Sequence, residues 1–168
     1  HSTARTLNSP PDNPLSARDY ESNTGGSGGN PRRILIGLDL LAHEADYHAG
    51  FYAAHGAERW MAAMWLPAPP GAVGLKSVLI RARLGAVVDR WFSQNRGEDS
   101  GLRHRAFAEA IRLTARTAGR RVPQPEYTPA PEAGRVASWL AERRAAGTGA
   151  ILLTTPSAAV RTCGAAQA

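Results

Sequence analysis

The sequence predicts an α/β fold with a parallel or mixed β-sheet and flanking helices. Short apolar runs that are typical of buried strands alternate with longer amphipathic stretches that are typical of helices. Loops rich in proline and glycine separate them, which is the pattern of strands joined by crossover helices. With 168 residues, 43% of them hydrophobic, the chain can bury one core of ordinary size.

The first half of the chain begins with a segment for which no regular core element is predicted. Residues 1–22 contain three prolines among small and polar side chains, and we expect them to be extended or disordered. Residues 33–38 predict a strand, and Asp39 is expected to cap a helix that runs to about His55, with Gly56 following it. One side of this helix carries Leu40, Tyr47, Phe51 and Ala54.

The middle of the chain predicts one strand and two helices. Residues 60–66 indicate a buried strand, and residues 67–74 form a loop rich in proline and glycine. Residues 75–92 predict a second helix, and residues 102–118 a third helix after a polar break. The apolar face of the second helix is expected to hold Ile80, Leu84, Val87, Val88 and Trp91.

The last third of the chain predicts a loop, two helices and a strand. Residues 122–131 contain four prolines and are expected to form a loop. Residues 132–145 predict a fourth helix, packed through Val136, Trp139 and Leu140, and Ala150–Thr154 reads as the last strand before a final helix over 158–168.

The glycine segment, residues 23–33, is the most informative stretch for function. Its four glycines allow backbone N–H groups to turn toward an anion, and its hydroxyls and arginines add further donors. A flexible linker has the same composition, and that alternative stays open. A Walker loop needs a lysine and must lead into a helix, whereas this segment has no lysine and leads into a predicted strand. The spacing of Gly26, Ser27, Gly28 and Gly29 does not fit a dinucleotide fingerprint either.

The glycine segment resembles the phosphate loop of the adenylate-forming enzymes, the acyl-CoA synthetase superfamily. The hydroxyl, glycine and proline positions of that loop match Thr24, Gly26, Ser27, Gly29 and Pro31. Residues more common in the family are replaced by Gly25, Gly28 and Asn30. A downstream run, residues 149–157 with a Thr-Pro-Ser turn, is similar to phenylacetate–CoA ligase-like members, as are residues 69–76 and 90–95. The resemblance covers about residues 15–168.

This resemblance implies that residues 23–168 are part of the N-terminal domain of an ATP-dependent carboxylate–CoA ligase. It implies ATP, Mg²⁺ and coenzyme A as cofactors and a small carboxylic acid as substrate. It also implies that Thr24, Gly26, Ser27 and Gly29 bind the phosphates of ATP. The family's motifs for adenine, ribose and Mg²⁺, and its catalytic lysine, would match positions beyond Ala168. We therefore expect a truncated domain that needs a further part of the same enzyme and is inactive when isolated; no catalytic residue is assigned.

The rival hypothesis is a non-enzymatic module that binds an anion or nucleic acid through arginine-rich helix faces. The formal charge is +6, and Lys76 is the only lysine. Basic residues recur along the second and third predicted helices, at Lys76, Arg83 and Arg90 and at Arg105, Arg112, Arg116 and Arg120. A solvated helix face has the same pattern. Regularly interleaved aromatics, which single-strand binders use, are missing from these helices, so nucleic acid is the less favoured partner.

The remaining reactive side chains carry no complete motif. Glu44, His48 and His55 lie near one helix face and could form a metal or acid–base cluster. Tyr47 stands where a zinc-protease helix needs its second histidine, so no metal site is predicted and the histidines are expected to be surface groups. Neither Thr155 nor Ser157 lies in a nucleophile elbow, and Cys163 is expected to be a packed thiol. The single cysteine and the absence of a membrane-spanning run or secretory signal favour a cytoplasmic protein.

Overall fold

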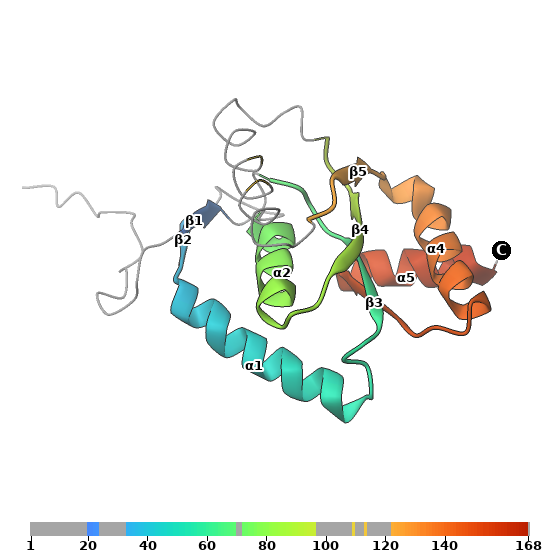
Figure 1. Ribbon diagram of the computed structural model, residues 1–168. Coiled ribbons are helices and arrows are strands. Elements are labelled where there is room, and N and C mark those ends of the chain that lie inside the picture. The colour runs from blue at the N-terminus through green and yellow to red at the C-terminus, as the bar shows by residue number, and fades with distance from the viewer. Residues whose placement is uncertain are drawn as a thin grey trace, which may run out of the picture.

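The protein is an α/β structure built on a four-stranded, all-parallel sheet (Figure 1). The computed structural model describes residues 20–23, 33–69, 72–96, 109, 113 and 122–167. The elements in chain order are β1 (Tyr20–Asn23), β2 (Arg33–Ile36), α1 (Leu38–Ala54), β3 (Met61–Trp65), α2 (Ala72–Arg83), β4 (Val88–Ser93), β5 (Pro125–Tyr127), the 3₁₀ turn η2 (Ala130–Glu132), α4 (Ala133–Ala145), β6 (Ala150–Thr154) and α5 (Pro156–Gln167). The prediction of a parallel α/β sheet with flanking helices is thus confirmed.

The strand order places helices on both faces of the sheet. The order is β5-β4-β3-β6, so the chain moves outward from β3 to β5 and then returns to β6 on the other side of β3. Right-handed crossovers that run in opposite directions place their helices on opposite faces. Accordingly α1 and α2 lie together on one side, and α4 and α5 lie together on the other (Figure 1). A separate antiparallel ribbon, β1 and β2, precedes this unit.

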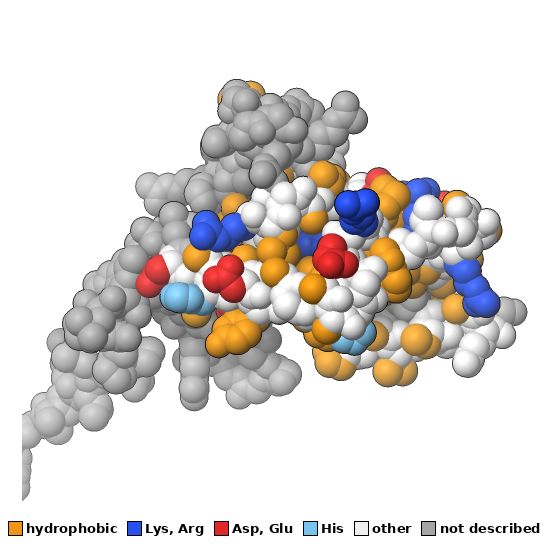
Figure 2. Space-filling model, turned by 60° about the horizontal axis from the view of Figure 1, so that its bottom comes forward, with side chains coloured by type: hydrophobic (Ala, Val, Ile, Leu, Met, Phe, Trp, Pro, Cys, Tyr) orange, Lys and Arg blue, Asp and Glu red, His pale blue; other side chains and the backbone are white. Residues whose placement is uncertain are grey.

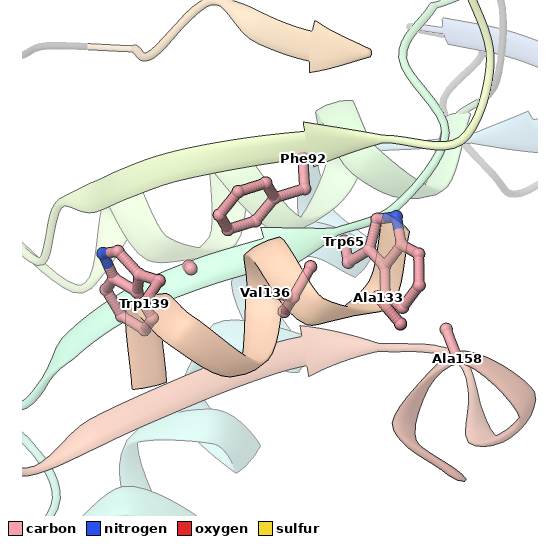
Figure 3. Packing of buried hydrophobic residues seen from close by; sticks show 7 residues of the cluster. Trp65, Phe92, Ala133, Val136, Trp139 and Ala158 are labelled. Carbon is pink, nitrogen blue, oxygen red and sulfur yellow. The ribbon is translucent and has the colours of Figure 1, made fainter. Parts of the chain in front are cut away.

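Strand β3 is the centre of the core because its side chains alternate between the two helical layers. Ala63 and Trp65 pack against Phe92, Val136, Trp139 and neighbours on the α4 and α5 side (Figure 3). Met64 and Leu66 pack with Val78, Val88 and Trp91 on the α2 side. Residues 62–66 are buried, as expected for a strand covered on both faces. The predicted strand over 60–66 and the packing residues Val136 and Trp139 are confirmed.

The predicted second helix over 75–92 is wrong, because that stretch holds a helix and a strand. Helix α2 ends at Arg83, and Gly85 follows with a φ of 73°. The N–H of Ala86 donates to the carbonyl of Arg81, which closes the helix end in a Schellman-type turn. β4 then begins at Val88, so Val88 and Trp91 face the core from a strand rather than from a helix. The apolar residues of α2 and β4 together follow the spacing of one long helix, which is why the sequence predicts a single helix here.

The loop predicted over 122–131 contains a strand that proline residues concealed. β5 is three residues long, lies at the edge of the sheet and begins with Pro125. An edge strand tolerates proline at its first position because no ladder bond is needed there. η2 follows, so the helical part begins at Ala130, before the predicted start at 132. The fourth predicted helix, over 132–145, is otherwise confirmed as α4, and β6 has the predicted bounds.

Helix α1 has the predicted length but a different cap and a different buried face. Gly37 rather than Asp39 is the N-cap, and Asp39 lies in the first turn, where its charge is favourable beside the helix N-terminus. The residues that pack inward are Leu41, Ala45 and Tyr52. The side predicted to be apolar faces out, with Leu40 46%, Phe51 59% and Tyr47 80% exposed. The predicted third helix over 102–118 lies outside the described residues except for positions 109 and 113.

Candidate functional site

The glycine segment lies between two strands that pair with each other. β1 and β2 run antiparallel, and Asn23 at the end of β1 stands opposite Arg33 at the start of β2. The two ends of the intervening residues 24–32 are therefore neighbours, so these residues connect the strands of a hairpin. The predicted phosphate-binding residues Thr24, Gly26, Ser27 and Gly29, and Pro31 with them, lie outside the described residues. The structure thus describes the two strands on either side of the predicted phosphate loop, and the loop itself stays a prediction.

The carboxyl edge of the sheet is a second place where ligands bind in parallel α/β folds. The chain leaves β3 toward α2 on one face and leaves β6 toward α5 on the opposite face, so the carboxyl ends of β3 and β6 mark a topological switch point. The Thr154 hydroxyl donates to the carbonyl of Trp65 there, at 3.1 Å. Thr155 and Ser157 lie at the N-terminus of α5, with their hydroxyl oxygens 3.3 Å apart.

The loops that follow β3 and β4 are tied together by side chains. The Ala68 N–H donates to the Oδ1 of Asn95 at 2.7 Å and to the Oγ of Ser93 at 3.0 Å. The Asn95 amide returns a bond to the carbonyl of Ala68 at 3.0 Å. Ser93 is fully buried and Asn95 is partly buried, so these bonds hold the backbone at Ala68 against the loop that follows β4.

A cavity lies between α1 and α2 and reaches β6. We call it the α1–α2 cavity; its volume is about 250 Å³, and it is lined by Glu44, His48, Tyr52, Val73, Lys76, Ser77, Ile80, Arg81 and Leu153. The Nζ of Lys76 lies 2.6 Å from a carboxylate oxygen of Glu44. The Nδ1 of His48 lies 3.4 Å from the hydroxyl of Tyr52, and the guanidinium of Arg81 stands 5.0 Å from the centre of the Tyr52 ring.

The structure divides the predicted Glu44, His48 and His55 group. Glu44 and His48 line the α1–α2 cavity and are partly buried, whereas His55 is exposed and bonds the carbonyl of Phe51 at 2.8 Å. The expectation of surface histidines is confirmed for His55, whereas His48 is partly buried in the cavity wall. Within the described part of the chain, no group of three His, Cys, Asp or Glu side chains is placed to hold a metal ion.

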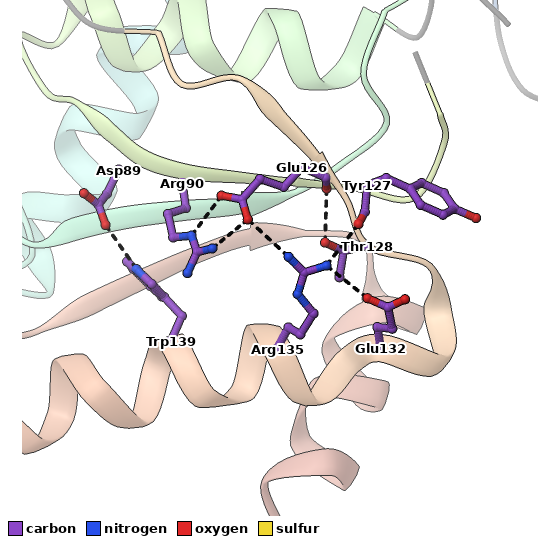
Figure 4. Close-up of polar contacts among 8 residues, drawn as sticks. All are labelled: Asp89, Arg90, Glu126, Tyr127, Thr128, Glu132, Arg135 and Trp139. Atoms are coloured by element: carbon purple, nitrogen blue, oxygen red, sulfur yellow. Dashed lines mark hydrogen bonds and ion pairs between the residues drawn. The ribbon is translucent and has the colours of Figure 1, made fainter. Parts of the chain in front are cut away.

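The first predicted basic stripe is not a continuous helix face. Lys76 pairs with Glu44, and Arg83 is exposed near the end of α2. Arg90 lies on β4 and donates two hydrogen bonds to Glu126, at 2.6 and 3.0 Å (Figure 4). These bonds raise the pKa of the Arg90 guanidinium above its ordinary value. The second stripe, Arg105, Arg112, Arg116 and Arg120, lies outside the described residues.

Arg90 belongs to a polar network that ties β4, β5 and α4 together. Glu126 also accepts a bond from Arg135 of α4 at 3.3 Å, and Arg135 bonds Glu132 at 3.0 Å (Figure 4). These side chains are roughly 36–46% exposed, so solvent weakens their attraction. The network therefore serves the packing of α4, and we assign it no chemical role.

Helix α5 carries Cys163, the single cysteine of the sequence. The expectation that Cys163 is packed is wrong, because its side chain is exposed. Helix α5 buries Ala158 and Thr162, four residues apart, and Cys163 falls on the next, solvent-facing side.

Within the described residues, no helix has the length and apolar character needed to span a membrane.

Comparison with family models, with curated proteins and with solved structures gave no match for this chain. The assignment of a site therefore depends on the residues and on the geometry described above.

Sequence reasoning missed the pairing of Tyr52 with Arg81, which forms one end of the α1–α2 cavity. Arg81 is only 2% exposed, although it was not singled out among the basic residues. One signal was present: Arg81 follows Val78 by three positions, so it stands in the row of α2 that faces inward. The helix predicted over 75–92 had Ile80, Leu84 and Val87 on its apolar face, and Arg81 was not among these residues.

Proposed function

We propose that this chain forms the phosphate-binding part of an ATP-dependent carboxylate–CoA ligase of the adenylate-forming type. The observation that supports the proposal most directly is the position of the glycine segment between the paired strands β1 and β2. A glycine-rich segment whose flanking strands pair with each other is suited to hold backbone N–H groups around a phosphate chain. The parallel α/β unit that follows β2 agrees with the domain that the resemblance implies.

In this proposal the chain's own residues position phosphates and perform no bond-breaking step. The hydroxyls of Thr24 and Ser27, with N–H groups near Gly26 and Gly29, donate hydrogen bonds to the β- and γ-phosphates. ATP, when bound, supplies the α-phosphorus that a small carboxylic acid attacks, and coenzyme A supplies the thiol that accepts the acyl group. The donors hold the pyrophosphate leaving group in line with the attack. We assign no Mg²⁺ ligand, and we place the protein in the cytoplasm, where these substrates are found.

The rival binding module has lost part of its support. Its first helix stripe is divided between α2 and β4, and two of that stripe's three cations are paired with carboxylates. The second basic stripe lies outside the described residues, and the test below therefore includes a variant of that stripe, Arg112→Ala.

The test is a pyrophosphate titration of the chain, followed by backbone amide shifts at moderate salt. We expect weak binding by the wild type, on the order of millimolar, because no adenine contacts contribute. Gly26→Val is expected to abolish it, since a β-branched residue resists positive φ and blocks the approach of the phosphate to the backbone. Gly50→Val is the matched control, because a Cβ at position 50 meets no atom within 4 Å. If Arg112→Ala alone weakens binding, anion capture belongs to the arginine stripe and the ligase proposal fails.

A further inference from the structure

Arg81 is a buried cation for which the described residues provide no counter-charge. Its side chain is 2% exposed, and its Nε and Nη1 atoms have no hydrogen-bond partner. Its Nη2 donates only a long bond, 3.3 Å, to the carbonyl of Trp60. A buried guanidinium normally pairs with a carboxylate, because removal of its hydration shell is costly unless an anion replaces it. Arg81 therefore has an unmet requirement for an anion.

The other charges around the α1–α2 cavity are already balanced. Lys76 and Glu44 neutralise each other at 2.6 Å. The Ser77 hydroxyl donates to the carbonyl of Val73, and the aromatic face of Tyr52 covers the Arg81 guanidinium at 5.0 Å. A ring face weakly attracts a cation and does not neutralise it. The cavity therefore carries one uncompensated positive charge, and it lies at the Arg81 end.

The rest of the cavity wall suits an apolar body. Tyr52, Ile80 and Leu153 line it, and a second hollow of about 430 Å³ shares His48, Tyr52 and Leu153 with it. The second hollow runs between α1 and β6 and is lined mainly by aromatic and aliphatic side chains, including Phe51 and Ile151. Figure 2 turns this side of the molecule forward and shows apolar side chains gathered between charged ones. Together the two hollows provide a charged end and an apolar groove.

We propose that the α1–α2 cavity binds a small organic monoanion with an apolar body, whose charge pairs with Arg81. One uncompensated charge and a largely apolar lining favour a monoanion over a polyphosphate. The guanidinium reaches the anion by turning away from the Trp60 carbonyl, and the long 3.3 Å bond offers little resistance. The apolar body of the ligand then lies against Tyr52 and Leu153. This site stands on α1, α2 and β6 and does not depend on the ligase proposal.

The test compares benzoate with its neutral isostere benzamide, using the Nε–H resonance of Arg81 as the reporter. We expect benzoate to shift this resonance saturably and benzamide to bind at least about tenfold more weakly. Benzenesulfonate should behave like benzoate, because it has the same charge and a similar body. Equal affinity for benzoate and benzamide, or an Arg81 resonance that does not move, would overturn the proposal without any variant.

Two variants then locate the site. Arg81→Met keeps the length of the side chain and removes the charge; we expect benzoate affinity to fall at least about tenfold while the melting temperature does not fall. Arg83→Met is the matched control, because Arg83 lies on the same helix and is exposed; its affinity should stay within about twofold of wild type. Should Arg81→Met fail to fold, Ser77→Phe, which fills the cavity from α2, must abolish binding instead. Retained binding in the folded variant, or an equal loss in Arg83→Met, contradicts the assignment.

Discussion

Gly74 lies against the indole ring of Trp91 so closely that no side chain fits between them. A Cβ at position 74 would stand 2.5 Å from the Cζ2 atom of Trp91 and 2.5 Å from the carbonyl oxygen of Pro67. Trp91 is 3% exposed and donates its indole N–H to the carbonyl of Leu66 at 2.9 Å. The contact therefore sets how closely the first turns of α2 approach the sheet.

Gly74→Ala should destabilise the protein although alanine favours helices. The new methyl group has to displace either backbone or a buried indole, and we expect a loss of roughly 1–3 kcal/mol in the free energy of unfolding. Gly50→Ala is the control, because it lies within α1 and its Cβ meets nothing within 4 Å; it should gain about 0.5–1 kcal/mol. Urea unfolding of both variants measures the difference, and a stabilising Gly74→Ala would show that the close contact is not formed in solution.

Asp89→Ala should cost more than Asp89→Asn. The indole N–H of Trp139, which is 2% exposed, donates to a carboxylate oxygen of Asp89 at 3.1 Å (Figure 4). Alanine leaves that N–H without its acceptor, at a cost of about 1 kcal/mol, whereas asparagine keeps an oxygen in place. Unfolding curves followed by tryptophan fluorescence compare the two; equal losses would mean that water replaces the carboxylate at no cost.

Glu126→Gln should destabilise the protein modestly, and the loss should not depend on pH near neutrality. The variant weakens the attraction to Arg90 and Arg135, and partial exposure limits the loss to about 0.5–1 kcal/mol. The pKa of Arg90 is raised in the folded state, so its contribution is present below its unfolded pKa and is lost only as the pH rises through the folded value.

The stability difference between wild type and Glu126→Gln should therefore be the same at about pH 6 and pH 9. Glu132→Gln, which removes one exposed partner of Arg135, is expected to cost less than about 0.5 kcal/mol. Chemical denaturation at both pH values measures these differences, and a loss that disappears at the higher pH would contradict the role given to Arg90.

Gly85→Ala should destabilise the end of α2, whereas Gly85→Asn should be tolerated better. Gly85 has a φ of 73°, a conformation that costs roughly 1–2 kcal/mol for a residue with a Cβ. Asparagine enters this region more readily because its side chain bonds locally. Thermal unfolding of both variants provides the measurement; identical melting temperatures for alanine and asparagine would argue against the Schellman-type end.

The sequence alone predicted the elements whose apolar period and end signals lie within the element itself. β6 over Ala150–Thr154 and α4 over Ala133–Ala145 were predicted within one residue, because each has a consistent apolar period and clear ends. Gly56 follows α1 with a φ of 61°, as its position predicted. The glycine segment was placed correctly ahead of a strand, because a short β-branched and aliphatic run, residues 34–36, follows it.

Long-range packing decided the elements that were predicted wrongly. Residues 75–92 read as one helix because the apolar residues of β4 continue the spacing of α2, and only pairing with β3 makes β4 a strand. β5 has three residues and exists because β4 offers it a partner. The inward face of α1 was misjudged since α2 covers Leu41 and Ala45 and leaves Tyr47 and Phe51 outside.

The sequence by itself determined the α/β class, most of the helices and strands, and the glycine segment, because these depend on short-range composition and period. Tertiary structure alone decided the candidate anion site. The spacing of three positions from Val78 places Arg81 in the inward row of α2 and separates it from the exposed Arg83, but it does not show whether a counter-charge lies beside it. The burial of Arg81 beside Tyr52, without a counter-charge, arises only when α1 packs across α2, because burial is a property of the neighbours that a residue acquires on folding.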